Sequence, residues 1–382
     1  MIALKKFVVL GILCITFSLF IKCSSLDQNN ADDPRGTAYA GSARCQSCHK
    51  NISDSYIHDS HYKTSAKANY DYCKKTIALP AHDTVQYTHN QAVVINKQND
   101  DLYQTSYNGG SSARSEKIDI AIGSAEKAQT YAYWKDDQLF ELPLTYLAAA
   151  KTWTNSPGFP IDHPYYTRVI PSRCFECHAS YVRTKEERLG SALQIKETMN
   201  SASIVYGIDC ERCHGPAAQH VKFQQEHPDV KKAKFMTSIK TLSRQQQLDM
   251  CGTCHAGDPV RLNSIFGFVP GDTLSRYYLY FTGSTGEPDV HGMQLQLLKL
   301  SKCFQGSQMT CNTCHSPHQS PEKPLNTAKT CVSCHQQVKH TTDITQANND
   351  CITCHMPLRA SKSLNFNNIE YMLRTHRIAI YK

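Results

Sequence analysis

Residues 311 to 318 read Cys311-Asn312-Thr313-Cys314-His315-Ser316-Pro317-His318. Two cysteines three positions apart, followed directly by a histidine, form the attachment signature of a c-type haem. The two thiols can form thioethers to the haem vinyl groups, and the adjacent imidazole can then bind the iron. His318, three residues further on, could supply the sixth ligand to the same iron or to a neighbouring one. The stretch therefore predicts a covalently bound haem at the centre of its segment.

The same CxxCH pattern occurs seven times in the 382 residues, and we number the copies motif 1 to motif 7 in chain order. Fourteen of the eighteen cysteines belong to these motifs, namely Cys45, Cys48, Cys174, Cys177, Cys210, Cys213, Cys251, Cys254, Cys311, Cys314, Cys331, Cys334, Cys351 and Cys354. The expected proximal ligands are the histidines that follow them, His49, His178, His214, His255, His315, His335 and His355. A lone CxxC pair could be half of a zinc site or a redox disulfide. Because every pair here is followed by histidine, the sequence predicts seven covalently attached haem c groups as cofactors.

Eleven of the eighteen histidines lie outside the motifs, which is enough for a second axial ligand on every iron. The preferred distal ligands are His61, His220, His318, His376 and His291, followed by His340 and His163. Three others, His58, His82 and His227, are interpreted as exposed or hydrogen-bonded side chains, and His89 is open between the two roles. Distal ligands often come from remote parts of a chain, so the sequence does not assign them to particular irons.

The N-terminus, residues 1–22, has the form of an export signal. Lys5 and Lys6 precede an apolar run, residues 7–21, that is short for a membrane span. Cys23 then opens a polar linker, residues 23–44. The arrangement resembles a bacterial lipoprotein signal with an acylated cysteine, but Lys22 departs from that pattern, and ordinary secretory cleavage is the alternative. Both interpretations predict export, to the periplasm or to the outer membrane or cell surface, with a lipid anchor on Cys23 in the first.

The formal charge of +8 does not indicate a nucleic-acid-binding protein. No basic stripe or recognition motif accompanies the charge. The propionates of seven haems would offset it, so the basic balance is interpreted as compensation for haem.

The segment without motifs suggests a division of the chain. A first haem segment, residues 45–83, precedes a β-rich insert, residues 84–142, in which short β-branched and aromatic runs alternate with turn clusters. Residues 143–382 form a region with six motifs. It holds a helix-permissive polar segment at 182–203, a short helix at 217–226 that presents His220, and an amphipathic helix at 290–304. We expect a mainly α-helical and irregular fold around a haem core, with the insert as an antiparallel meander.

Two further cysteines, Cys73 and Cys303, remain in the exported chain. A disulfide between them, two free thiols and an intermolecular role are all compatible with an oxidising compartment. The sequence gives no distance between them.

Four segments carry a resemblance to exported bacterial multihaem c-type cytochromes. They are residues 45–61, 210–220, 303–318, and 351–357 with His376. The closest general likeness is to the doubled-CxxCH group that includes the tetrahaem cytochrome partner of hydroxylamine oxidoreductase. The resemblance implies closely packed haems in parallel and perpendicular pairs, each usually low-spin, that pass single electrons along a chain.

These features favour an electron-transfer protein that connects redox partner proteins of the respiratory chain or cell envelope through bis-histidine haems. The alternative is a reductase or oxidase of a small nitrogen or sulfur compound, with one haem that has an open site. All seven motifs end in histidine, and the usual sequence mark of such a site, a CxxCK variant, is absent. A third interpretation is an adaptor whose β-rich insert docks a partner.

Overall fold

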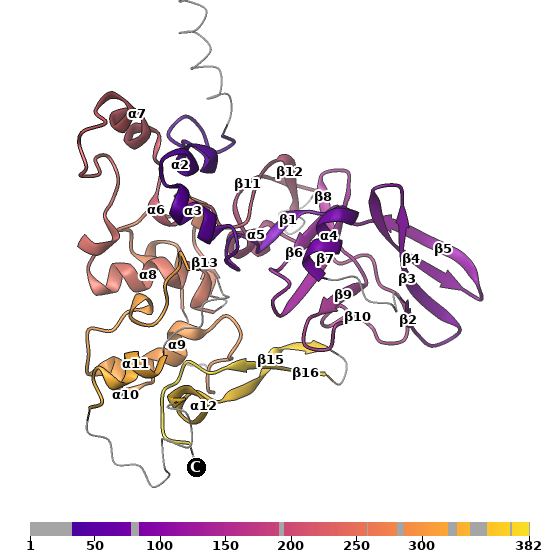
Figure 1. Cartoon of the computed structure of the whole chain (residues 1–382). Helices are drawn as coiled ribbons and strands as arrows, with labels where there is room; N and C mark the ends of the chain where they lie inside the picture. Colours follow the sequence, from indigo (N-terminus) through magenta and orange to yellow (C-terminus); the bar gives the residue numbers. More distant parts are fainter. Residues whose placement is uncertain are drawn as a thin grey trace, which may run out of the picture.

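The computed structural model describes residues 33–77, 84–190, 195–257, 259–280, 286–319, 327–336, 350–366 and 369–381. The segment expected to be an export signal, Cys23 and His340 lie outside these ranges. Two halves are visible in Figure 1, a β-rich half and a half built from short helices that carry the motifs. Among the described residues, no helix has the length and apolar character needed to cross a membrane.

The β-rich half consists of two antiparallel sheets. One has the order β2-β3-β4-β5 and the other the order β1-β6-β7-β9-β10, with β8 paired to β7. The strands of the first are β2 (Thr84–Gln86), β3 (Gln91–Gln98), β4 (Asp101–Asn108) and β5 (Ser111–Lys117). Those of the second are β1 (Ser65–Lys67), β6 (Ile120–Ile122), β7 (Ala128–Lys135), β8 (Gln138–Glu141), β9 (Leu144–Leu147) and β10 (Thr152–Asn155). The strands expected between residues 84 and 142 are therefore present, but they divide into two sheets and recruit strands from both sides of that interval.

This half has an apolar core of its own. Tyr131 and Leu142 are fully buried in it, and Trp153 packs its ring against Tyr131 at 5.1 Å between centroids. Helix α4 (Tyr70–Ile77) adds Cys73 and Ile77 to the same core. Burial of this much aromatic and aliphatic surface stabilises the half without any cofactor.

The motif half is made of short helices. They are α2 (Ser42–Cys48), α3 (Lys50–Tyr56), α5 (Ser172–His178), α6 (Cys210–His214), α7 (Ala218–Glu226), α8 (Arg244–His255), α9 (Gln294–Lys299), α10 (Lys302–Gln305), α11 (Thr327–Val332) and α12 (Cys351–His355). Single 3-10 turns lie at η2 (Ile239–Thr241), η3 (Ile265–Gly267), η4 (Leu274–Arg276) and η5 (Cys311–Thr313). One helical turn is sufficient for CxxCH, because residues three and four apart lie on the same helix face. Asp209 precedes motif 3 and accepts a hydrogen bond from a first-turn amide of α6, and Asp350 precedes motif 7 and does the same for α12. These N-caps make each helix begin at the first cysteine of its motif.

The expected mainly α-helical fold is wrong: 28% of the described residues are helical and 31% are in strands. Three two-stranded antiparallel sheets contribute strands outside the β-rich half. They are β11 (Ala179–Arg188) with β12 (Ile195–Tyr206), β13 (Val260–Arg261) with β14 (Tyr278–Leu279), and β15 (Leu358–Phe366) with β16 (Ile369–Arg374). The first replaces the helix-permissive segment at 182–203. Its lysines and glutamates favour helix locally, but Val182, Met199 and Ile204 are buried in one cluster, and this tertiary packing overrides propensity.

The amphipathic helix expected over residues 290–304 is interrupted at Ser301, between α9 and α10. Ser301 is fully buried, and its hydroxyl accepts a hydrogen bond from the Ile378 amide at 2.8 Å. The hydroxyl also lies 3.4 Å from the carbonyl oxygen of His376. The break therefore anchors the C-terminal segment beside motif 5, a contact that the local pattern does not reveal.

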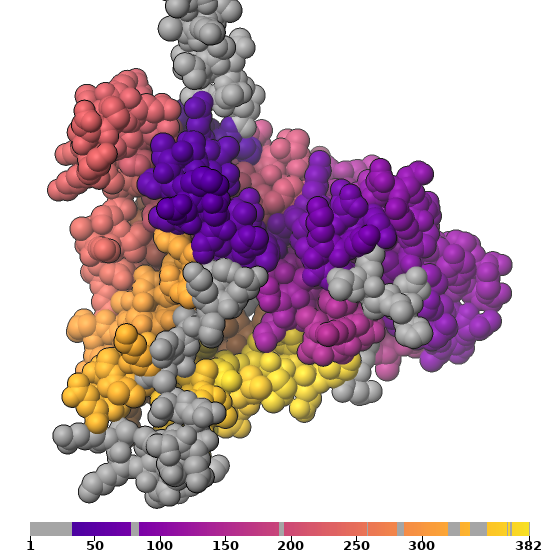
Figure 2. Space-filling model, viewed as in Figure 1, coloured from indigo at the N-terminus to yellow at the C-terminus, as the bar shows by residue number. Residues whose placement is uncertain are grey.

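The first segment joins the two halves. Strand β1 pairs with β6 of the β-rich half, while Glu211 of α6 accepts hydrogen bonds from the amides of Ala40 and Gly41. Figure 2 shows this segment, in indigo, between the β-rich half in purple and the later motifs in coral and orange. Residues just after motif 1 are thereby held close to motifs 3 to 5.

Candidate functional site

One large cavity runs through the motif half. Its volume is about 3540 Å³, and all fourteen motif cysteines and all seven motif histidines line it. Five of the seven expected distal ligands also line it, namely His61, His220, His291, His318 and His376. Pockets for single drug-sized ligands have volumes of about 300–1,000 Å³, and protein interiors are otherwise close-packed. The cavity thus has room for several large groups side by side.

Four pairs of imidazoles face each other across this cavity. The ring centroids of His49 and His220 are 6.5 Å apart, those of His214 and His318 are 5.8 Å apart, and those of His315 and His376 are 6.1 Å apart. A fourth pair, His61 and His255, has a separation of 6.0 Å. Each pair joins one motif histidine to one expected distal ligand from a remote part of the chain.

These separations fit two axial ligands of one metal. With a metal–nitrogen bond of about 2 Å, and that nitrogen roughly 1 Å from its ring centre, two imidazoles on opposite sides of a metal have centroids about 6 Å apart. In the described ranges, no three histidine, cysteine or acidic side chains converge as a metal site. Two imidazoles per centre is the number that an iron within a porphyrin takes. The cavity, the cysteine pairs and the ring pairs therefore fit haem c.

The pKa shifts of four histidines in the cavity suit metal binding. Burial lowers the pKa of His214 and His315, and it lowers the pKa of His376 to about 4. Burial also lowers the pKa of His178, with a smaller contribution from nearby His291, which places these two rings in one neighbourhood. Neutral imidazole is the form that binds a metal, so these ligands need no deprotonation near pH 7.

Cysteines of different motifs contact one another along the cavity. Three such pairs are Cys45–Cys210, Cys177–Cys254 and Cys251–Cys311. In each pair a hydrogen bond to the second cysteine, together with burial, raises the pKa of the first. Burial and the neighbouring Cys351 raise the pKa of Cys331 to about 11, and Cys314 is also close enough to contribute. Burial raises the pKa of Cys213 to about 11, and nearby Cys254 contributes in the same direction.

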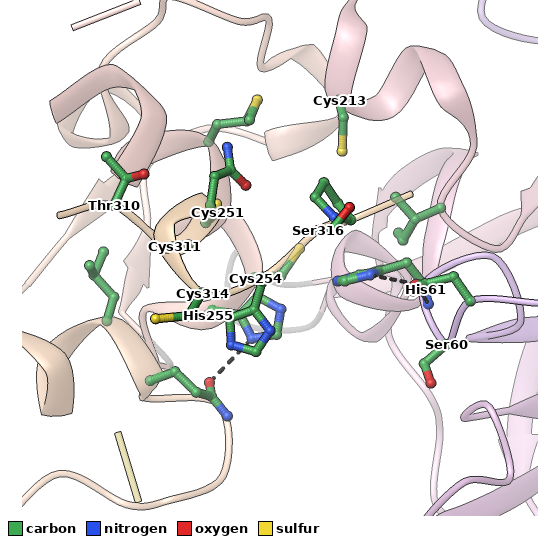
Figure 3. A pocket seen from close by; sticks show the side chains of 18 of the residues that line it. Ser60, His61, Cys213, Cys251, Cys254, His255, Thr310, Cys311, Cys314 and Ser316 are labelled. Atoms are coloured by element: carbon green, nitrogen blue, oxygen red, sulfur yellow. Dashed lines mark hydrogen bonds and ion pairs between the residues drawn. The ribbon is translucent and has the colours of Figure 1, made fainter. Parts of the chain in front are cut away.

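These contacts give the motifs a spatial order that differs from their order in the sequence. Motif 1 adjoins motif 3, which adjoins motif 4, and motifs 5, 6 and 7 follow in turn. Motif 2 adjoins motif 4 through Cys177 and Cys254. Motif 4, Cys251–His255, is therefore a branch point with neighbours on three sides. Figure 3 shows Cys251 and Cys254 beside Cys311 and Cys314 of motif 5, with Cys213 of motif 3 above them.

Several ligand candidates are held by hydrogen bonds to the ring nitrogen Nδ1. Asp59 Oδ1 lies 2.8 Å from His61 Nδ1, and Gln294 Oε1 lies 3.2 Å from His255 Nδ1. Further contacts join His178 to the Thr64 hydroxyl at 2.8 Å, His220 to the Lys234 carbonyl at 3.0 Å, and His355 to the Ala379 carbonyl at 2.9 Å. Such contacts leave Nε2 available and fix the orientation of the ring.

His163 and the two cysteines outside the motifs differ in their positions relative to the cavity. His163 contacts Asp162 at 2.8 Å in the β-rich half and is not part of the cavity lining, so the structure does not bring it to a motif. Cys73 is buried in the core of the β-rich half, whereas Cys303 lines the cavity near Cys314. Both are free thiols, with no disulfide between them.

Sequence reasoning missed the buried acidic residues within two motifs. Motifs 2 and 3 are the only ones with charged residues between their cysteines, and this was the available signal. In motif 2, Glu176 contacts Arg173 at 3.3 Å and Arg261 at 3.2 Å. In motif 3, Glu211 is fully buried and contacts Arg35 at 3.2 Å. Both carboxylates fix the backbone of their motif to remote segments.

Comparison with known proteins gives no further assignment: no family model, no curated protein and no solved structure matches this chain.

Proposed function

We propose that the chain is an exported seven-haem c-type cytochrome that transfers single electrons between redox partner proteins of the cell envelope. The observation that carries the proposal is the set of four ring pairs, each with a motif histidine and a remote histidine at 5.8 to 6.5 Å. Both axial positions are then taken by protein, an arrangement that suits electron transfer rather than substrate binding.

The chain's own residues would act as follows. The cysteine pairs would hold the haem edges covalently, and the motif histidines with their partner rings would hold the iron. When bound, each haem supplies a reversible one-electron couple. The protein excludes water from the centres, orients the imidazoles through their Nδ1 hydrogen bonds, and keeps neighbouring centres at short range through the contacts between motifs.

The order of the motifs supports a branched conduit. Electrons would pass between motif 1 and motif 7 by way of motifs 3, 4, 5 and 6, with motif 2 as a side branch at motif 4. A conduit with three ends can join more than two partners. Motif 2 is the end next to the β-rich half, because α5 leads directly into β11, and Val182 of β11 packs in one cluster with Ile120 of β6. The β-rich half is then the natural place for a partner of that branch.

Mass spectrometry and spectroscopy of the exported protein test the proposal. Intact mass should show seven haems, and also a diacylglycerol on Cys23 if the signal is of the lipoprotein type. The oxidised protein should give wholly low-spin optical and EPR spectra that do not respond to nitrite or hydroxylamine. A high-spin component that shifts on their addition would overturn electron transfer in favour of a reductase or oxidase. Absence of covalent haem would overturn both functions.

A further inference from the structure

Motif 4 differs from the other paired motifs in the orientation of its rings. The planes of His61 and His255 are 88° apart, whereas the other three pairs lie within 15°, 15° and 21° of parallel. Nearly parallel imidazoles and perpendicular imidazoles produce different splittings of the iron dπ orbitals. Perpendicular planes leave two of these orbitals close in energy, so a low-spin ferric centre of this kind has a much more anisotropic EPR signal.

The perpendicular orientation has a structural cause in Asp59. Its Oδ1 accepts a hydrogen bond from the His61 backbone amide at 2.8 Å and lies 2.8 Å from His61 Nδ1. The main chain at His61 is also fixed from its other side, because the His61 carbonyl accepts a hydrogen bond from the Ile208 amide at 2.9 Å. One carboxylate oxygen thus holds both the main chain and the ring of this ligand.

Asp59 also gives His61 a different electronic environment. Among the eight paired imidazoles, all within the described part of the chain, only His61 has a carboxylate at hydrogen-bonding distance from its ring. A carboxylate that accepts the Nδ1 proton makes the ligating nitrogen more basic. A more basic ligand stabilises ferric iron relative to ferrous iron and lowers the reduction potential. The opposite ring, His255, has a neutral acceptor in Gln294, which acts in the same direction.

We propose that Asp59 is a positioning residue that makes the haem of motif 4 the lowest-potential centre of the four ring-paired haems, at the junction of the three arms. This inference rests on the proposed function. A low-potential junction is crossed by electrons but is not where they reside. Each arm then keeps its electrons until a partner withdraws them, so the arms are filled separately although they share one chain.

EPR-monitored redox titration of the haem-loaded full-length protein tests this role. Among the four ring-paired centres the strongly anisotropic low-spin signal belongs to motif 4, and its change in Asp59→Ala distinguishes it from any similar signal of motifs 2, 6 and 7. In the native protein this signal should appear at a lower potential than the signals of the three near-parallel centres. Asp59→Asn keeps an acceptor oxygen but removes the charge, so the signal should keep its shape while its potential rises relative to the others. Asp59→Ala should both raise the potential and change the anisotropy, because the ring is released.

A matched control is Asp54→Asn. Asp54 lies on α3 in the same segment, is exposed, and contacts only Lys50 at 2.9 Å, so the change removes the same charge without touching a ligand. It should move all signals by a similar small amount. A native anisotropic signal that is not the lowest in potential, or equal shifts in Asp59→Asn and Asp54→Asn, would overturn the role of Asp59. Either result leaves electron transfer intact, whereas loss of every low-spin signal in the native protein would refute the function itself.

Discussion

Replacing Glu211 with glutamine should loosen the contact between motif 1 and motif 3. Glu211 Oε1 accepts hydrogen bonds from the amides of Ala40 at 2.9 Å and Ala217 at 2.8 Å. Its Oε2 accepts from the Gly41 amide at 2.8 Å and from Arg35 at 3.2 Å. The carboxylate therefore joins the segment before motif 1 to the loop that leads into α7, the helix with His220.

The magnitude follows from which contacts glutamine can keep. Its carbonyl can replace Oε1, but its amide group must face the Gly41 amide and the Arg35 guanidinium, which are donors. Loss of a hydrogen bond to a charged group costs about 1.5–3 kcal/mol, and breaking a buried ion pair costs about 3–5 kcal/mol. Arg35 keeps its contacts with Asp33 at 2.8 Å and Asp209 at 2.7 Å, so the lower part of that range applies. We expect a loss of about 2–4 kcal/mol in the local opening free energy.

Hydrogen exchange of the haem-loaded protein measures this change directly. Exchange at the amides of Ala40 and Gly41 should accelerate about 30- to 1000-fold, since about 1.4 kcal/mol corresponds to a factor of ten. Glu226→Gln is the control, because Glu226 is exposed and reaches Lys222 only at 4.0 Å. That change should alter the opening free energy by less than about 0.5 kcal/mol. Unchanged exchange at both amides in Glu211→Gln would refute the assignment of the buried carboxylate as the link.

Three further predictions concern ligands, packing and pH. His220→Ala should remove one low-spin EPR signal and create a high-spin one, because His49 loses its partner ring. The control is His227→Ala, which should leave the EPR spectrum unchanged because His227 lies at the end of the same helix but outside the cavity lining. Gly207→Ala should destabilise the protein by more than about 3 kcal/mol in denaturant unfolding, because φ of Gly207 is +65° and a Cβ there would overlap the Tyr62 carbonyl. Gly190→Ala should cost only about 1 kcal/mol, because Gly190 has a similar φ of +69° but faces open space. Burial by itself would raise the pKa of Asp289, but hydrogen bonds from Ser363 and Lys362 outweigh it and lower the pKa to about 2. The ionised carboxylate therefore stabilises β15 fully at pH values above 3.8, its pKa in the unfolded chain. This contribution should be lost as pH falls through about 2, with exchange at the Lys362 and Ser363 amides accelerating there, and Asp289→Asn should remove the pH dependence.

The expected distal ligands show where local pattern is sufficient and where it fails. His61, His220, His318 and His376 were selected from their short-range context, and all four face a motif histidine. The partner of each was not predictable, because the pairs join residues from 49 to 376 across segments whose proximity depends on the whole fold. His163 was selected by the same reasoning, but the strands around it place it in the β-rich half.

The helical content was overestimated for a related reason. The motifs need one helical turn each, and the intervening segments contain many helix-favouring residues, so the local pattern favours helix. The pairing of residues 179–188 with 195–206, and of 358–366 with 369–374, arises from contacts between segments rather than from propensity.

The sequence by itself determined which thiols and imidazoles are grouped, because CxxCH places two cysteines and a histidine within five consecutive residues. It also determined that a strand-rich segment separates motif 1 from the others. Only the tertiary structure decided which rings face each other, in which order the motifs adjoin, and that motif 4 lies at a branch. The physical reason is that a CxxCH turn is a local structure, whereas a second axial ligand and a neighbouring motif can be supplied by any segment that folding brings within a few ångströms.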